Sequence, residues 1–184
     1  MGDLSRPKTV GLGPRKSELK RYGPLPSFAL PGVKTQTVNP DFKELLLTFN
    51  AHDVEYLVVG AHALAAHGHV RATKDLDLWV RPNQENAERI LTALSEFGAP
   101  RGDLTRADLS RTGTVFQIGM PPLRIDLITA IDGVRFEEAW PDRFVTAFGG
   151  VPVSVISRHH LIVNKKASAR LQDLADVERL NAND

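Results

Sequence analysis

Two aspartates separated by one residue stand inside an apolar run of this sequence. Asp75 and Asp77 alternate with Leu76 and Leu78 and are followed by Trp79. Residues i and i+2 of a β-strand point to the same face of the sheet, so the two carboxylates share one face. Like charges at a half-buried place cost free energy unless a cation compensates them. The pattern therefore indicates a divalent-cation site, and phosphate chemistry is the usual use of such a site.

A third acidic residue lies in a similar apolar context further along the chain. Asp126 falls within the segment RIDLIT, which has the composition of a buried strand. Two strands of one sheet can present all three carboxylates together, and such oxygens are the ligands that one or two Mg²⁺ ions prefer. Asp126 can also accept a proton from an attacking hydroxyl. The D-x-D spacing alone is a weak signal, which the third strand aspartate strengthens.

A glycine marks the start of a short helix just before the acidic strand. The apolar stretch Val54–Val59 predicts a strand, and Gly60-Ala61 opens an alanine-rich helix that runs to His67. The free N–H groups at a helix N-terminus bind phosphate, and glycine lets the phosphate approach the backbone closely. A tight turn that needs glycine for its geometry alone explains the same residues equally well.

Three further side chains near this turn are candidates for nucleotide contacts. Arg71 and Thr73 come just before the aspartates and can donate hydrogen bonds to phosphate oxygens. An arginine in such a place is also commonly a solvated surface charge. His62 is the best candidate among the nearby histidines. Their spacing is not that of a helical metal-ligand pair, which favours structural or surface roles for the group.

Hydrophobic periodicity and turn residues predict an α+β protein, with one mixed sheet flanked by helices. The order β-α-β-α-β-β-β-β-α does not suit a doubly wound parallel sheet. A first helix is expected after Asn39-Pro40, which reads as an N-cap followed by proline at the first helical position. The other predicted helices are Ala61–His67, Gln84–Phe97 and Arg158–Leu180, and the predicted strands are Val54–Val59, Lys74–Val80, Thr114–Ile118, Leu123–Thr129, Phe144–Phe148 and Val151–Val155.

The composition is that of an ordinary globular protein. The 184 residues are 42% hydrophobic and 24% charged, and the net charge of +1 says nothing by itself about partners. The absence of cysteine excludes disulfides and cysteine-ligated zinc. The apolar runs are shorter than the ~20 residues that a membrane span needs. The N-terminus lacks the apolar core of a signal peptide, so we expect a cytoplasmic protein without membrane association.

The first 38 residues differ in character from the rest of the chain. Residues 1–39 hold seven Lys/Arg and two acidic residues, a net charge of +5, together with five prolines and five glycines. We expect residues 1–38 to be a flexible basic extension and residues 39–184 to be the folded domain. A poorly packed extension is the simpler interpretation. An arm that follows nucleic-acid phosphates is the alternative, weakened by the lack of interleaved aromatic residues.

The unit VGAHALAAHG-x-x-RATKDLDLWV resembles the nucleotidyltransferase superfamily, which shares the fold of the DNA polymerase beta catalytic domain. Within it, the chain is most similar to the small bacterial AbiEii-like group, whose members recur in toxin–antitoxin and phage-defence pairs. The family pattern is a Gly-Ser or Gly-Gly that opens a helix, an Asp-x-Asp strand and a later third aspartate. The resemblance covers about residues 39–181, and its matching positions are Gly60-Ala61, Asp75, Asp77 and Asp126.

The resemblance implies a nucleoside triphosphate donor, Mg²⁺ and release of pyrophosphate. Asp75 and Asp77 would hold the metal ions, and Asp126 would complete the metal site and activate the acceptor. The tail of the group resembles the segment that carries Lys165, Lys166, Arg170, Asp173 and Asp176. Lys166 or Lys165, with Arg170, would reach the triphosphate. On one continuous helix Lys166, Arg170 and Asp173 share a face, so Asp173 would orient a neighbouring cation by pairing. From spacing alone, an exposed helix with charges four residues apart explains these positions better.

The chain departs from the family pattern at two places. Ala61 stands where a serine often contacts a phosphate, so only backbone donors remain there. Such a loss weakens binding by one hydrogen bond to a charged group, about 1.5–3 kcal/mol. Relatives often have a glycine turn where this chain has Ser168-Ala169, so the helix is expected to run straight.

Two functions of different classes follow from this pattern. The first is an Mg²⁺-dependent nucleotidyltransferase that moves a nucleoside monophosphate from an NTP to a hydroxyl of a tRNA 3′ end, a protein side chain or a small molecule. The second is a non-catalytic nucleotide-binding partner that keeps the fold, which Ala61 favours. Three buried negative charges have no purpose in such a protein, so the first function is preferred. The pattern does not define the acceptor, the base or the oligomeric state.

Overall fold

We analysed a computed structural model that describes residues 8–10, 39–100, 102–120 and 123–182. The strands are β1 (Lys8–Val10), β2 (Tyr56–Val58), β3 (Asp75–Val80), β4 (Val115–Met120), β5 (Leu123–Ile128), β6 (Phe144–Phe148) and β7 (Val151–Val155). The helices are α1 (Pro40–Ala51), α2 (Gly60–Ala66), α3 (Gln84–Phe97), α4 (Arg106–Leu109), α5 (Phe136–Ala139), α6 (Arg158–Ser168) and α7 (Leu171–Asn181).

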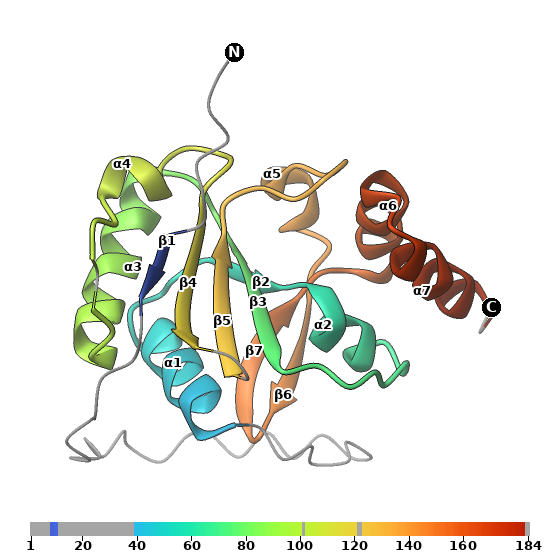
Figure 1. Cartoon of the computed structure of the whole chain (residues 1–184), viewed down its shortest axis with the longest axis horizontal. Helices are drawn as coiled ribbons and strands as arrows, with labels where there is room; N and C mark the ends of the chain where they lie inside the picture. Colours follow the sequence, from blue (N-terminus) through green and yellow to red (C-terminus); the bar gives the residue numbers. More distant parts are fainter. Residues whose placement is uncertain (1–7, 11–38, 101, 121–122, 183–184) are drawn as a thin grey trace.

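The described strands form one mixed sheet in the order β1-β4-β5-β3-β2-β7-β6. Consecutive strands pair antiparallel as β2–β3, β4–β5 and β6–β7. The crossover pairs β3–β5 and β2–β7 are parallel. The predicted α+β class with a mixed sheet is therefore confirmed. Figure 1 shows α1 and α3 near one end of the molecule and α6 with α7 at the other.

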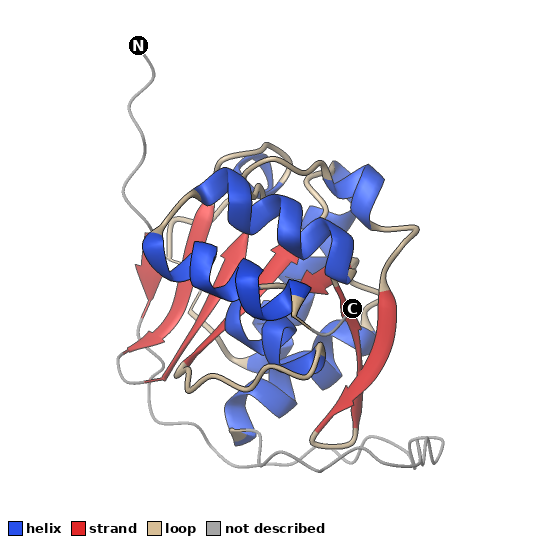
Figure 2. Cartoon of the chain, turned by 90° about the vertical axis from the view of Figure 1, so that its right-hand side faces the viewer, coloured by secondary structure: helices blue, strands red, loops and turns tan. Residues whose placement is uncertain are grey.

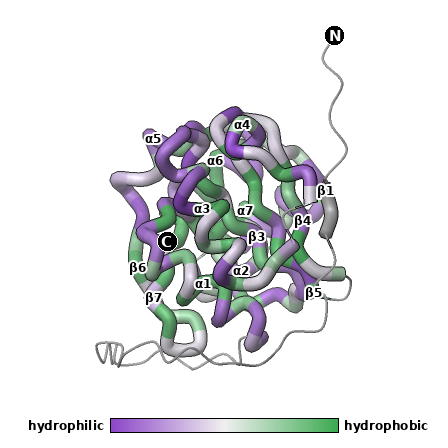
Figure 3. The backbone as a smooth tube through the Cα atoms, turned by 90° about the vertical axis from the view of Figure 1, so that its left-hand side faces the viewer, coloured by the Kyte–Doolittle hydropathy of each residue, from purple (hydrophilic) through white to green (hydrophobic). Residues whose placement is uncertain are grey.

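The alternation of side chains along β3 gives the sheet an apolar face and a polar face. Leu76 and Leu78 are buried and belong to the same core cluster as Ile90 of α3 and Leu45 of α1. The aspartates of β3 alternate with these leucines and point to the other face. Figure 2 shows helices packed over the strands, and Figure 3 shows hydrophobic and hydrophilic stretches in both helices and strands. The core therefore fixes which face carries the carboxylates.

The N-terminal boundary of the fold differs from the prediction. Lys8–Val10 forms β1, which pairs parallel with Phe116–Ile118 of β4 and extends the sheet at that edge. The expectation that the folded domain begins at residue 39 is therefore wrong for these three residues. An edge strand offers unpaired N–H and C=O groups, and a short extended segment can use them without any periodicity of its own. Residues 1–7 and 11–38 of the predicted extension lie outside the described residues.

The C-terminal helical region is broken, whereas a straight helix over Arg158–Leu180 was expected. Helix α6 ends at Ser168 and α7 begins at Leu171. Ala169 adopts a left-handed conformation with φ of 52°, the geometry that glycine usually supplies at a helix C-terminus. The turn present in the resembled family is thus made here without glycine. No helix within the described ranges has the length and apolarity to span a membrane.

Candidate active site

The register of β3 and β5 places the predicted acidic residues beside one another. Asp77 lies opposite Asp126 in the parallel pair β3–β5, and Asp75 lies opposite Arg124. Because directly opposed residues on neighbouring strands point to the same face, all three carboxylates share the polar face of the sheet. The predicted convergence of two strands on one acidic cluster is what this register produces.

Gly60 brings the start of α2 directly against Asp77. Gly60 has φ of 62°, and a Cβ atom added there would lie 2.1 Å from Oδ2 of Asp77. The backbone of β2 reaches this turn through Val59, whose N–H donates to the carbonyl of Asp77 at 3.1 Å. Both the left-handed conformation and the close approach require glycine. The helix N-terminus predicted as a phosphate site therefore lies against a predicted metal ligand.

The burial of Asp77 among like charges perturbs its ionisation. Burial, together with the neighbouring carboxylates Asp126 and Asp75, raises the pKa of Asp77 from 3.8 to about 7. The charges of Arg124 and Arg71 lower this pKa by less. Burial also raises the pKa of Asp126, against the opposing influence of Arg124. Asp77 therefore lacks enough nearby positive charge to ionise fully at neutral pH. Such a deficit is typical of carboxylates that bind a cation.

Arg124 is a site residue that the sequence analysis missed. Its Nε donates to Oδ1 of Asp126 at 2.8 Å, and its Nη2 donates to Oδ2 of Asp75 at 3.2 Å. The other carboxylate oxygen of Asp126 accepts from Nε2 of Gln117 at 3.4 Å. The signal was present in the sequence, because Arg124 stands two residues before Asp126 and therefore points to the same face.

The acidic cluster fits a divalent cation by its chemistry, although its side chains are not arranged as a metal site. Among the described residues, no three His, Cys, Asp or Glu side chains are grouped closely enough to hold a metal ion. The reason is visible in the contacts of Arg124, whose guanidinium group binds both Asp75 and Asp126. A hard cation prefers carboxylate oxygens, and the unbalanced charge around Asp77 is what such an ion would neutralise.

Lys165, rather than Lys166, is the lysine of α6 that is buried and paired with aspartates of α7. Lys165 is 4% exposed, whereas Lys166 is exposed. Nζ of Lys165 donates to Oδ1 of Asp173 at 2.9 Å and to Oδ2 of Asp176 at 2.7 Å. The predicted pairing of Asp173 with Lys166 or Arg170 is therefore wrong. Its premise was a continuous helix, and the turn at Ala169 changes which side chains meet.

A cavity of about 300 Å³ joins the acidic cluster to the C-terminal helices. Gly60 and Asp77 line it from α2 and β3, and Lys165, Arg170 and Asp173 line it from the region of α6 and α7. Asp75 and Asp126 stand on the strands beside Asp77 and are not among the lining residues. The structure thus brings one predicted metal ligand, the glycine turn and two predicted cations to a single cavity.

The same cavity has lining residues that the sequence did not indicate as parts of a site. The Ser168 hydroxyl donates to Oδ2 of Asp132 at 3.0 Å. Nδ2 of Asn164 donates to the backbone carbonyl of Asp132, also at 3.0 Å. All three residues line the cavity. Gly133 allows this contact, because a Cβ atom there would lie 2.6 Å from Cβ of Ala167. No spacing in the sequence links the turn around Asp132 to α6.

Two residues predicted to contact the nucleotide, His62 and Ala61, lie outside the lining of the cavity. The ring of His62 packs between two phenylalanines, with its centroid 6.1 Å from that of Phe42 and 5.9 Å from that of Phe148. Burial lowers the pKa of His62. Ala61 is buried in α2. Neither residue lines the cavity.

Arg71 and Thr73 lie in the segment that leads into β3. Nη1 of Arg71 is 4.0 Å from Oδ2 of Asp176, and its charge also lowers the pKa of Asp77, so Arg71 lies between the acidic cluster and α7. The Thr73 hydroxyl donates to the carbonyl of Asp75 and accepts from its N–H, at 3.1 and 3.3 Å. Thr73 therefore shapes the start of β3, which sets the direction of the first aspartate.

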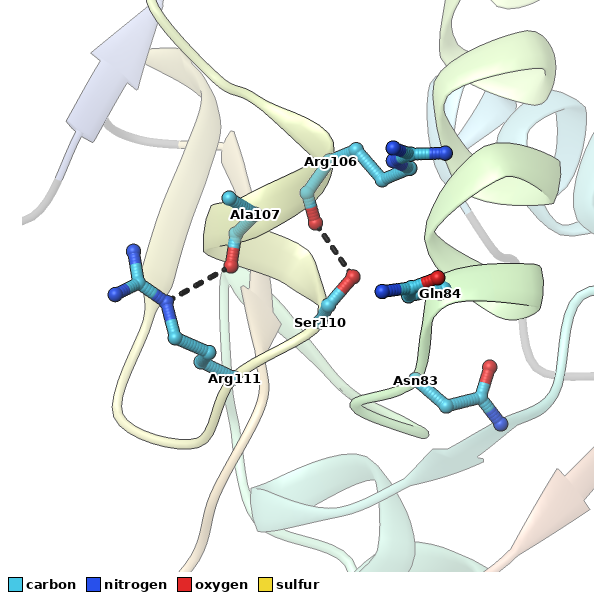
Figure 4. A pocket seen from close by; sticks show the side chains of 6 residues that line it. All are labelled: Asn83, Gln84, Arg106, Ala107, Ser110 and Arg111. Carbon is cyan, nitrogen blue, oxygen red and sulfur yellow. Dashed lines mark hydrogen bonds between the residues drawn. The ribbon is translucent and has the colours of Figure 1, made fainter.

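A second hollow, of about 510 Å³, lies away from the acidic cluster between α3 and α4. Its lining includes Arg106 and Arg111. Nε of Arg111 donates to the Ala107 carbonyl, and Nη1 of Arg106 contacts Oε1 of Glu88 at 2.5 Å. Figure 4 shows the two guanidinium groups pointing in opposite directions. The hollow therefore lacks convergent polar groups, and the cavity beside Asp77 is the better candidate site.

Comparison with solved structures identifies the fold. The lincomycin-bound crystal structure of the lincosamide antibiotic adenylyltransferase LnuA is similar at a TM-score of 0.51 and 12% identity, over 78% of this chain and 96% of that chain. A candidate nucleotidyltransferase from Thermotoga maritima is similar at a TM-score of 0.48 and 14% identity, over 80% of this chain and 94% of that chain.

This chain therefore has the nucleotidyltransferase fold, and the resemblance found in the sequence is confirmed at the level of the fold. No family model and no curated protein matches the sequence. The AbiEii-like group stays a prediction.

Proposed function

We propose that this protein is an Mg²⁺-dependent nucleotidyltransferase, which transfers a nucleoside monophosphate from an NTP to a hydroxyl group of an acceptor. The observation that carries the proposal is the meeting of Gly60 with Asp77 beside the in-register pair Asp77 and Asp126. Nucleotidyl transfer requires a phosphate-binding helix N-terminus next to the carboxylates that bind the metal ions. The fold shared with LnuA supports the same reaction class.

Asp75, Asp77 and Asp126 would hold one or two Mg²⁺ ions, which would neutralise the triphosphate and lower the pKa of the acceptor hydroxyl when bound. Arg124 would then give up part of its contact with Asp75 and Asp126, because the ions need the same carboxylate oxygens. The positive charge of Arg124 holds the carboxylates together in the metal-free protein.

The residues of this chain supply the remaining parts of the reaction. The N–H groups of Gly60 and Ala61, with Lys165, Arg170 and Arg71, would bind the triphosphate. The acceptor oxygen would form a bond to the α-phosphorus as the bond to the β-phosphate breaks, and pyrophosphate would leave. The proton of the acceptor hydroxyl would pass to Asp126, whose raised pKa suits proton acceptance.

The acceptor is a hydroxyl compound whose class the cavity does not define. LnuA is named for adenylyl transfer to a lincosamide antibiotic, which makes a small molecule one choice for this chain. A tRNA 3′ end and a partner protein, as in toxin–antitoxin or phage-defence pairs, are the other two. His62 and Thr73 would act through the packing of α2 and the start of β3.

The test is transfer of label from each [α-³²P]NTP to total tRNA, to host-lysate proteins and to lincomycin in the presence of Mg²⁺. The wild-type protein, Asp77→Asn, Asp126→Asn and the exposed-site control Lys166→Ala would be compared. We expect label in one acceptor class with wild type and Lys166→Ala, and a loss of at least 100-fold with either aspartate variant. NTP binding without transfer to any acceptor would instead support the non-catalytic partner.

A further inference from the structure

The two carboxylate partners of Lys165 differ in their access to the cavity. The side chain of Asp176 is 1% exposed, and Asp176 does not line the cavity. The side chain of Asp173 is 18% exposed, and Asp173 lines the cavity together with Asp77. One partner is therefore enclosed between the helices, whereas the other is on the wall that a triphosphate would contact.

Asp176 has the environment of a permanent anchor. Besides Lys165, Arg71 and Arg179 lie near its carboxylate, at 4.0 Å from Oδ2 and 3.7 Å from Oδ1. Three cations thus face one buried carboxylate that is contributed by α7. Lys165 is the buried member of these three cations, so removing the charge of Asp176 would leave its ammonium group with Asp173 alone. Asp176 must therefore remain in place for Lys165 to keep its position.

Asp173 occupies the position on Lys165 that an anionic ligand would use. An ammonium group has three N–H donors, and two of those on Lys165 bind Asp173 and Asp176. A phosphate oxygen that enters the cavity can make the same charge-assisted hydrogen bond as Oδ1 of Asp173. The negative charge of Asp173 would also repel the incoming triphosphate, because both lie along the same wall.

We propose that Asp173 is an exchangeable partner of Lys165, which a triphosphate oxygen displaces when the nucleotide binds, and that Asp176 is the anchor that holds Lys165 in place. This inference rests on the proposed function. It makes α7 a part of the nucleotide site and assigns opposite effects to two aspartates on the same lysine. Asp173 lowers the affinity for the nucleotide, whereas Asp176 raises it.

The test is isothermal titration calorimetry with Mg²⁺ and each of the four NTPs, and separately with inorganic tripolyphosphate. We expect Asp173→Asn to tighten binding about tenfold and Asp176→Asn to weaken it about tenfold. Asp132→Asn is the matched control, because Asp132 lines the same cavity and pairs with Ser168 rather than Lys165. Its effect should stay within about twofold. In a Lys165→Gln background, Asp173→Asn should change the affinity by no more than Asp132→Asn does, because only the general charge effect remains.

Two patterns of affinity among the variants would overturn the inference. One is a shift in the same direction for Asp173→Asn and Asp176→Asn, which a merely structural ion pair would give. The other is equal tightening by Asp132→Asn and Asp173→Asn, which would mean that total cavity charge, not exchange at Lys165, sets the affinity. If Asp176→Asn fails to fold in thermal melts, the comparison of Asp173→Asn with Asp132→Asn decides.

The same titrations separate this inference from the proposed function. Binding that responds to the variants as expected, without label transfer to any acceptor, would retain the exchange at Lys165 and reject the enzymatic proposal. Label transfer by the wild-type protein, together with an unchanged NTP affinity of Asp173→Asn, would retain the enzymatic proposal and reject the exchange at Lys165. Absence of binding by the wild-type protein to both NTPs and tripolyphosphate would overturn the exchange.

Discussion

At the scale of single residues, the charge of Asp77 that a metal site needs lowers the stability of the metal-free fold. Its pKa is raised from 3.8 to about 7 by burial and by two neighbouring carboxylates. Since the folded state favours the protonated form, the stability that this provides is present below pH 3.8. It is lost progressively as the pH rises towards 7. The charged form of Asp77 therefore destabilises the metal-free protein at neutral pH.

The variant Asp77→Asn tests this conflict. Asparagine removes the charge without a large change of volume, so the metal-free variant should be more stable than wild type at pH 8, by about 1–3 kcal/mol. The difference should shrink at pH 4, where Asp77 is protonated in the folded protein. Urea unfolding at the two pH values, in EDTA, measures it. Equal stabilisation at both pH values would contradict the account.

Gly60 is the second residue whose identity is fixed by the geometry of the site. Gly60→Ala would place a Cβ atom 2.1 Å from Oδ2 of Asp77 and force a non-glycine residue to adopt φ of 62°. We expect a loss of about 1–2 kcal/mol in the free energy of unfolding from the conformation alone. The displacement of Asp77 should reduce transfer activity more than this loss of stability explains.

The control for Gly60→Ala is Gly98→Ala, which tests a glycine with φ of 79° and no atom within 4 Å of an added Cβ. This variant should lose similar stability and keep its activity, because Gly98 ends α3 and does not line the cavity. Urea unfolding and the label-transfer assay compare the two. Retention of full activity by Gly60→Ala would remove the glycine turn from the site.

At the scale of elements, the turn between α6 and α7 positions the cations of the cavity. Ala169 takes the left-handed conformation that glycine favours, with φ of 52°. The turn orients α7 so that Asp173 and Asp176 reach back to Lys165 of α6. A straight helix would separate these residues along its length. The break in the helix is therefore what assembles the buried ion pairs.

Ala169→Gly should stabilise the protein, because glycine adopts this conformation without a steric cost. Glycine also has more conformational freedom in the unfolded chain, so the expected net gain is roughly 0.5 kcal/mol. Ala167→Gly, within α6, serves as the control and should lose about 1 kcal/mol. Chemical denaturation measures both. A destabilising Ala169→Gly would show that the left-handed turn is not part of the folded protein.

Sequence patterns predicted the elements where side-chain periodicity is strong. The alternation of leucine with aspartate predicted β3 and its carboxylate face, and the apolar run around Asp126 predicted β5. The register that places Asp77 opposite Asp126 came only from the structure. The turn at Ala169 had no such signal, because alanine is a good helix former. The identity of the buried lysine depends on that turn. Lys165 was therefore not separable from Lys166 by spacing alone.

At the scale of the whole molecule, the mixed sheet was predictable in kind but not in extent. Hairpins and turn residues indicated six strands, and β1 adds a seventh from the segment expected to lie outside the fold. Contacts between segments far apart in the sequence, such as Asn164 with Asp132 and Arg71 with Asp176, have no local pattern. They arise once folding brings α6 beside the turn around Asp132 and α7 beside the segment that leads into β3.

Binding should stabilise the whole fold if the acidic cluster and the cavity form one ligand site. A ligand that binds the folded state raises its stability in proportion to the logarithm of its concentration over its dissociation constant. We expect Mg²⁺ with a non-hydrolysable NTP to raise the melting temperature of wild type by several degrees, about 2–4 °C per kcal/mol. The same mixture should have no effect on Asp77→Asn. Equal shifts for both proteins would mean that the nucleotide binds elsewhere.

The most direct test of the central claim follows the fate of two labels in one reaction. The protein would be incubated with Mg²⁺, total tRNA, lysate proteins and lincomycin, and with NTP labelled at either the α- or the γ-phosphate. We predict that the α-label appears on the acceptor, that the γ-label appears in pyrophosphate, and that both outcomes depend on Asp77 and Asp126. Transfer of the γ-label to the acceptor, or transfer that survives both aspartate substitutions, would contradict this claim.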